Sequence, residues 1–303
     1  MSADQGGQLL QTAWEWLLVP APFTSAPRAA VLGLLLSLVL AGVLTLWLAL
    51  PWARRWWSDE LARPGEDERG VSTEELTLTE HLIELRNRLV RGIVVLAIAT
   101  SVAFVFYQRW FDVALWPCRG CQLQAITPTE LIFAYFKVTL VVGLLVAMPW
   151  IAYEAWAYIA PGLTRKERKY VIAVIPGATV SFLVGVMFAY FALTPAALTF
   201  LLHFGNTAQV DIRPTVGSYI GFITRLLIAT GAIFELPLAM FFLSKLHLIN
   251  PKMLGSIRRY VVVAAFIIAA VVTPTPDPFN QLLVAVPIMY GAFDVLALRR
   301  WWR

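Results

Sequence analysis

Long apolar runs alternate with short charged clusters along the 303-residue chain. Most runs are about 20 residues long, the length at which an α-helix crosses a hydrocarbon core of about 30 Å. The pattern predicts seven membrane-spanning helices, at residues 29–51, 89–107, 131–156, 170–198, 217–243, 260–273 and 282–298. The last two runs have only roughly 14 to 17 residues, so we expect the bilayer to thin beside them.

Composition and charge agree with this pattern. Hydrophobic residues make up 59% of the chain and charged residues only 14%, too few charges for a soluble globular protein. The lysines and arginines are unevenly distributed, since 18 of the 24 lie in segments 51–91, 158–170, 245–259 and 298–303. Retained loops are enriched in these residues, so we expect a multi-pass protein of the cytoplasmic membrane, with its N-terminus outside and its C-terminus in the cytoplasm. The same loops explain the net charge of +5 without a nucleic-acid partner.

The first run and the segment after it differ from the rest. No A-x-A-like cleavage site follows residues 29–51, and Arg54 and Arg55 come directly after them, which favours a retained anchor over a removed signal peptide. Residues 52–76 have the mixed charges and the Pro-Gly interruptions of a linker. Near its end, Ser72 and Glu75 have the spacing of a capping box, which predicts a helix that continues into the second span.

The fifth run contains a carboxylate, Glu235, and two residues later Pro237, which removes a backbone donor. Arg225 and Lys245 lie ten residues to either side, which places Glu235 near the middle of the bilayer. A charge at that depth costs roughly 2.5 to 3.5 kcal/mol on insertion scales. The carboxyl is therefore satisfied inside the bundle, by Thr230 or a freed carbonyl, or it faces a cavity or a partner, or it is protonated.

Two further acids are candidates for a site beside the membrane. Glu84 lies four residues before Arg88, so spacing alone favours an exposed salt bridge worth a few tenths of a kcal/mol. Glu167 lies in the segment LTRKERK between two spans, where a solvated loop charge is as good an interpretation as a binding residue.

Five segments together resemble the TatC family, the receptor subunit of the twin-arginine protein translocase. They are HLIELRNRL (81–89), AYEAWAYIAPGLTRKERKYV (152–171), AYFALTPAALTFL (189–201), SYIGFITRLLIATGAIFELPLAM (218–240) and VTPTPDPFNQLLVAVPIMY (272–290). The resemblance implies an all-α integral membrane protein with a glove-shaped six-helix bundle at residues 77–300. Residues 1–28 would be an extracytoplasmic segment, 29–51 an additional transmembrane helix and 301–303 a cytoplasmic tail.

The resemblance also implies a function without covalent chemistry. Members of this family bind twin-arginine signal peptides of folded proteins and recruit TatA/TatB-type single-span subunits into an oligomeric pore driven by the proton-motive force. Glu84 and Glu167 match the family positions for arginine recognition, and a carboxylate accepts the two-donor fork of a guanidinium. Arg86, Pro161 and Gly162 match positions that shape this surface. Glu235, with Pro237, would contact the inserted signal hairpin or a partner's span.

The predicted outer loops also carry candidate residues. Pro117 and the turn around Asp277 match the family, and for Asp277 a turn-forming role is favoured over a direct contact. Cys118 and Cys121 are the only cysteines; we expect a local disulfide, with free thiols and redox catalysis as alternatives. The scattered histidines exclude a four-ligand zinc site from this chain alone, and no cofactor motif is present.

Two other functions remain open from the sequence. A proton-coupled transporter would use Glu235 as its proton carrier, but it predicts an internal repeat and further midplane acids that the sequence lacks. A membrane thiol oxidoreductase built on Cys118 and Cys121 lacks a second cysteine pair to relay electrons.

Overall fold

The computed structural model describes residues 78–118, 122–159, 165–204, 213–245, 258–273 and 281–289. The additional span predicted at 29–51, the segments 1–28 and 52–76 and the tail 301–303 lie outside these ranges, so they stay predictions. Within the described residues the regular structure is helical, apart from one isolated bridge between Gln124 and Thr215.

Four of the predicted spans are confirmed as apolar helices long enough to cross a membrane. They are α3 (Leu78–Phe104), α5 (Pro128–Ile159), the continuous run of α6 (Arg165–Phe188), η3 (Ala189–Leu193) and α7 (Thr194–Phe204), and α8 (Val216–Lys245). The sixth span is α10 (Arg258–Val272), whose 15 residues confirm the short helix expected there. Residues 281–289, where the seventh span was predicted to begin, are helical.

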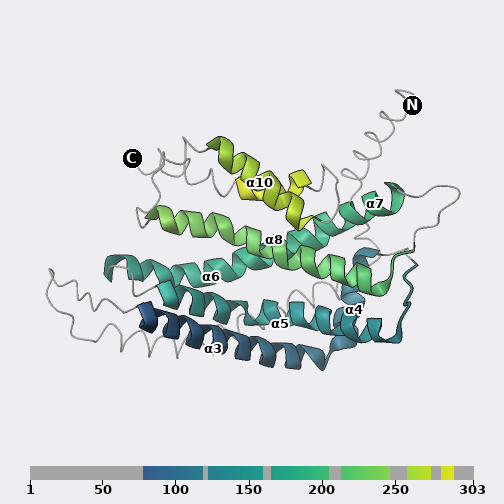
Figure 1. Cartoon of the computed structure of the whole chain (residues 1–303), viewed down its shortest axis with the longest axis horizontal. Coiled ribbons are helices and arrows are strands. Elements are labelled where there is room, and N and C mark those ends of the chain that lie inside the picture. Colours follow the sequence, from purple (N-terminus) through teal and green to yellow (C-terminus); the bar gives the residue numbers. More distant parts are fainter. Residues whose placement is uncertain are drawn as a thin grey trace.

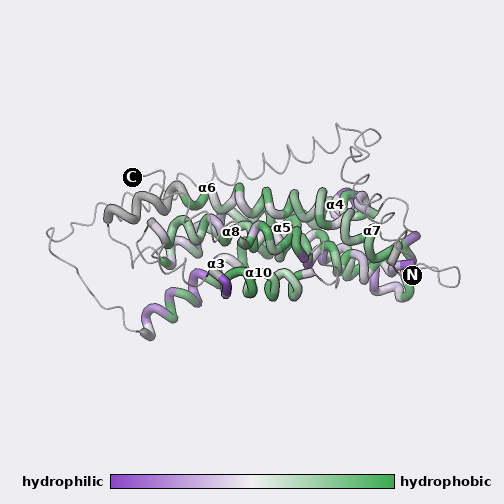
Figure 2. The backbone as a smooth tube through the Cα atoms, turned by 90° about the horizontal axis from the view of Figure 1, so that it is seen from above, coloured by the Kyte–Doolittle hydropathy of each residue, from purple (hydrophilic) through white to green (hydrophobic). Residues whose placement is uncertain are grey.

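The long helices lie side by side, and the short helix α4 (Tyr107–Leu115) lies across one end of them (Figure 1). The closest neighbours are α3 with α5, α6 with α8, and α5 with α8. Apolar residues fill the middle of the bundle, while polar residues concentrate at the start of α3 and at the opposite end (Figure 2). The molecule therefore has two polar ends separated by an apolar slab.

Glycines let the helices approach closely at two crossings. A Cβ atom on Gly143 of α5 would lie 2.7 Å from the Thr100 backbone of α3, and one on Gly231 of α8 would lie 2.7 Å from the Phe182 ring of α6. Neither site leaves room for a side chain without a shift of its neighbour. The contact between Gly143 and Thr100 also sets the register of α3 along α5.

One polar end, which we call the cap end, consists of α4, η1 (Trp116–Cys118) and the segments 122–130 and 213–219. The hydroxyls of Tyr190 and Tyr219 each donate a hydrogen bond of 2.6 Å to a carbonyl of α4, from Val113 and Ala114 respectively. Tyr190 belongs to the π-helical turn η3, which ends two residues before Pro195 in the first turn of α7. The widened turn thus supplies one of the two tyrosines that hold α4.

A carboxylate joins two helix starts at the cap end. Glu130, in the first turn of α5, accepts 2.6 Å from the backbone N–H of Gly217 and 2.9 Å from that of Ile126. The N–H groups of a first helical turn have no partner within their own helix, so the carboxylate satisfies an orphan donor at the start of α8. A Cβ on Gly217 would lie 2.8 Å from the Glu130 side chain, which explains the glycine.

Candidate functional site

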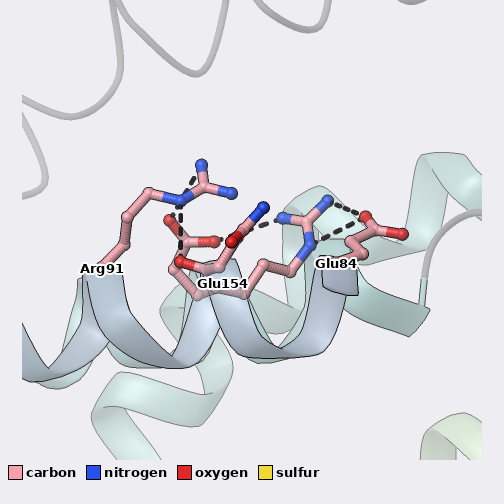
Figure 3. A network of polar contacts seen from close by, with 5 residues as sticks. Glu84, Arg91 and Glu154 are labelled. Atoms are coloured by element: carbon pink, nitrogen blue, oxygen red, sulfur yellow. Dashed lines mark hydrogen bonds and ion pairs between the residues drawn. The ribbon is translucent and has the colours of Figure 1, made fainter. Parts of the chain in front are cut away.

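The opposite polar end carries a network of charged side chains, which we call the network end (Figure 3). It joins the start of α3 to the last turns of α5. Arg88 lies at its centre, between Glu84 of its own helix and Glu154 of α5. Arg91 contacts Glu154 from the other side.

The two glutamates hold Arg88 in different ways. Glu84 Oε1 accepts from both Nε and Nη2 of Arg88, at 2.9 and 2.6 Å. Glu154 Oε2 accepts from Nη1 at 3.2 Å. The pair of Arg91 and Glu154 is longer, 3.5 Å between Nη1 and Oε1, and is an ion contact without hydrogen-bond geometry. The guanidinium of Arg88 is therefore fully engaged, and that of Arg91 is only loosely held.

Burial separates an anchored part of the network from an accessible part. The side chain of Glu154 is 5% exposed and that of Arg88 is 11%, whereas Glu84 is 26% exposed and Arg91 54%. No hydrogen bond joins Glu84 Oε2 to the described residues, and Figure 3 shows this oxygen pointing away from Arg88. Among the described residues, one oxygen of this accessible carboxylate thus has no donor and can accept a further one.

Sequence reasoning identified the pair of Glu84 and Arg88 but missed Glu154. The i, i+4 spacing of Glu84 and Arg88 predicted their ion pair correctly. It predicted an exposed pair, however, whereas the side chain of Arg88 is only 11% exposed. Glu154 was placed inside the predicted span 131–156 and received no role. The available signal was a lone carboxylate within an apolar run, which requires a nearby cation.

Three further contacts lie beside this network. The ring of His81, one turn before Glu84, stacks on Tyr158 of α5 with centroids 4.4 Å apart. Arg86, predicted to shape the surface, is exposed and donates to the side chain of Asn87 at 3.2 Å. The backbone carbonyl of Asn87 in turn accepts from Arg91 at 3.3 Å.

The structure corrects the setting predicted for Glu167. The sequence interpretation placed it in a loop, but α6 begins at Arg165, so Glu167 lies in the first turn of a helix. A negative charge is favourable there because the helix dipole is positive at that end. Its side chain lies outside the described residues, as do Pro161 and Gly162 of the preceding connection. Whether Glu84 and Glu167 share one site stays a prediction.

Glu235 lies within α8 and is partly buried. Within the described part of the chain, its Oε1 atom and the Thr230 hydroxyl are both buried without a hydrogen-bond partner. One interpretation of the sequence made Thr230 the hydrogen-bond partner of Glu235, and the structure contradicts it. The hydroxyl of Ser181 on α6 donates to the carbonyl of Phe234 at 2.5 Å, three residues before Pro237, which lies inside the continuous helix α8.

The remaining candidates belong to the cap end. Pro117 lies in the 3₁₀ turn η1 after α4. Cys118, in the same turn, is buried and disulfide-bonded, while Cys121 and Asp277 lie outside the described residues. No cluster of three or more His, Cys, Asp or Glu residues that could hold a metal occurs in the described ranges.

Comparison with known proteins gives concordant matches. Residues 80–287 match the family model "Sec-independent protein translocase protein (TatC)". The protein of that name from Aquifex aeolicus is 37% identical over 220 residues, which cover 71% of this chain and 90% of the relative. The one from Carboxydothermus hydrogenoformans is 33% identical, with 71% and 88% covered. A crystal structure of the twin-arginine translocase receptor TatC superposes with a TM-score of 0.62 at 35% identity, covering 72% of this chain and 99% of that one.

Proposed function

Since the chain belongs to the TatC family of Sec-independent protein translocase proteins, we propose that it is the receptor subunit of a twin-arginine translocase. It binds the twin-arginine signal peptides of folded cargo proteins at the network end. With TatA/TatB-type single-span subunits it organises an oligomeric pore driven by the proton-motive force. It lies in the cytoplasmic membrane with the network end and its C-terminus facing the cytoplasm, as the distribution of lysine and arginine favours.

The observation that carries this proposal is the contact between Glu84 and Arg88. One oxygen of Glu84 already accepts two donors of a guanidinium, and the other oxygen is free of the described residues. The carboxylate is therefore shaped and placed to accept a second guanidinium from outside. An ammonium group offers a point charge and cannot reproduce the planar fork, so lysine is a poorer ligand.

Glu167 supplies the second carboxylate of the proposed site. It follows Ile159, the last residue of α5, by eight positions, and Tyr158 stacks on His81 one turn before Glu84. Both acids therefore belong to the same end of the molecule. Arg86, Pro161 and Gly162 shape the surface around them.

Glu235 acts after recognition in this proposal. Its partly buried carboxyl lies in the apolar slab, two residues before Pro237 of the same helix. A polar group at that depth requires a partner. The inserted signal hairpin or the span of a small subunit provides one.

Peptide binding to the purified full-length protein in nanodiscs tests the proposal. A fluorescent twin-arginine signal peptide should bind at least about tenfold more tightly than the same peptide with two lysines. Glu84→Gln and Glu167→Gln should each weaken twin-arginine binding by about tenfold, because a charge-assisted hydrogen bond is lost. Glu235→Ala should leave this binding intact and reduce cross-linking to single-span subunits.

Glu80→Gln is the matched control, since it removes an acid one turn from Glu84 on the same helix. It should bind the peptide like the wild type. Wild-type affinity in the double variant of Glu84 and Glu167, or equal affinity for the two-lysine peptide, would contradict the proposal.

A further inference from the structure

Two basic side chains lie on spanning helices far from the network end. Lys137 belongs to α5 and Arg225 to α8, and both side chains are exposed. Neither makes a hydrogen bond or an ion pair with any of the described residues. An ionisable group within a membrane span requires a partner, so both are candidates for a binding role.

The fold brings the two residues to one junction between helices. The Lys137 Nζ atom lies 3.6 Å from the position that a Cβ atom on Gly221 of α8 would occupy. Arg225 follows Gly221 by one helical turn, so the two positions are neighbours on the surface of α8. The ammonium group of Lys137 thus reaches the face of α8 that carries Arg225.

The depth of this pair follows from the charge pattern of the helices. Residues 92–104 of α3 and 138–153 of α5 contain no charged side chain. The first stretch follows Arg91 and the second ends just before Glu154, so both extend from the network end. The stretch in α5 spans about 25 Å from Glu154 to Lys137. At the level of Lys137, α3 ends at Phe104, whose ring stacks on Phe136 with centroids 4.9 Å apart. Lys137 and Arg225 therefore mark the rim of the apolar slab toward the cap end.

We propose that Lys137 and Arg225 bind the phosphodiester of an anionic phospholipid, in the leaflet on the side of the cap end. The acid of the same junction, Glu130, lies two turns before Lys137 on α5, and both of its oxygens accept backbone N–H groups. The two cations therefore have no acid partner among the described residues, and two like charges attract an anion strongly where the dielectric constant is low. Phosphate matches the guanidinium fork and accepts from the ammonium group as well. A headgroup with a net negative charge is favoured over a zwitterionic one, because the site carries two positive charges.

Apolar residues beside Lys137 support a lipid as the source of this phosphate. Phe133 and Leu140, one turn before and one turn after Lys137, are 62% and 45% exposed. They present a surface for acyl chains on the helix face that carries the ammonium group. The slab of about 25 Å is thinner than a hydrocarbon core of about 30 Å. A headgroup held at its rim would draw the leaflet inward at this junction.

Native mass spectrometry of the full-length protein, released from nanodiscs of equal phosphatidylglycerol and phosphatidylcholine, tests the site. The wild type should retain phosphatidylglycerol over phosphatidylcholine by about threefold or more, and the Lys137→Gln, Arg225→Gln double variant should lose this preference. Arg109→Gln, which removes an exposed cation on α4, should keep it. The charge-preserving exchange Lys137→Arg with Arg225→Lys should also keep it, which separates loss of charge from damage to the fold.

Three results would overturn the assignment. The first is an undiminished preference for phosphatidylglycerol in the double variant. The second is competition by millimolar inorganic phosphate that removes the bound lipid, because this would indicate a site for a soluble anion. The third is unchanged lipid retention together with lost cross-linking to a single-span subunit, which would assign the pair to a protein contact.

Discussion

The two polar ends of this molecule are held together by different kinds of bond. At the cap end, the side chains of Tyr190, Tyr219 and Glu130 bind backbone groups of neighbouring elements. At the network end, Glu84 and Glu154 bind the guanidinium of Arg88. One end is joined through the main chain, and the other through charged side chains.

This difference determines what each end can do. A backbone N–H or carbonyl is fixed by its helix, so its partner can leave only if the helix moves or a buried polar group is left unpaired. At the network end the accessible carboxylate of Glu84 keeps one oxygen without a partner among the described residues, so it can accept a further cation while the buried pair of Arg88 and Glu154 stays intact. The cap end is therefore suited to hold the bundle together, and the network end to admit an arginine from another protein.

Separating α3 from α5 should produce the largest effect, because this pair of helices connects both ends. We expect Gly143→Leu to prevent folding, since even a Cβ atom there would lie 2.7 Å from the Thr100 backbone. Size-exclusion chromatography in detergent should show loss of the monodisperse peak. Gly92→Leu is the control, because nothing lies within 4 Å of a Cβ at Gly92. A folded Gly143→Leu protein with wild-type thermal stability would contradict this account of the packing.

Breaking the cap end alone should destabilise the fold and spare recognition. Glu130→Ala removes the acceptor of the Gly217 and Ile126 amides. We expect the melting temperature in detergent to fall by roughly 5 °C. The affinity of the remaining folded protein for a twin-arginine peptide should not change. Asp112→Ala, at an exposed acid of α4, should leave the melting temperature as it is, and an equal loss in both variants would show that Glu130 has no special role.

Removing Arg88 should strengthen the binding of a twin-arginine peptide at the network end. Arg88→Gln takes away the cation that neutralises Glu84 and occupies its Oε1 atom. We expect affinity for a twin-arginine peptide to rise by about threefold, because the incoming guanidinium then meets a more negative acceptor. Fluorescence anisotropy with the purified protein measures this change. A fall in affinity would mean that Arg88 orients Glu84 for binding and does not compete with the cargo.

Added salt should have the smallest effect. It should weaken peptide binding at the network end and leave the cap end unchanged. Raising the ionic strength from about 0.1 M to about 0.5 M shortens the screening length and weakens exposed charge pairs. We expect peptide affinity to fall by about twofold while the melting temperature stays within about 1 °C, since the cap end depends on short hydrogen bonds. A large salt effect on the melting temperature would show that ion pairs hold the bundle together.

Much of the fold follows from sequence patterns with a local cause. Long apolar runs predicted four spanning helices, and the 15 residues of α10 confirmed a short one. The i, i+4 spacing of Glu84 and Arg88 predicted their ion pair, because residues one turn apart meet on any helix. The motifs that resemble the TatC family predicted the match of residues 80–287 to its family model.

What the sequence by itself determined is thus which segments are helices, which parts of them are apolar, and which residues meet one turn apart. Only the tertiary structure decided that Glu154 lies against Arg88, 66 residues away in the chain, and that Lys137 reaches the surface of α8 beside Gly221. These contacts depend on how far one helix slides along another. That register is set by close approaches such as Gly143 with Thr100, which no periodicity within a single helix encodes.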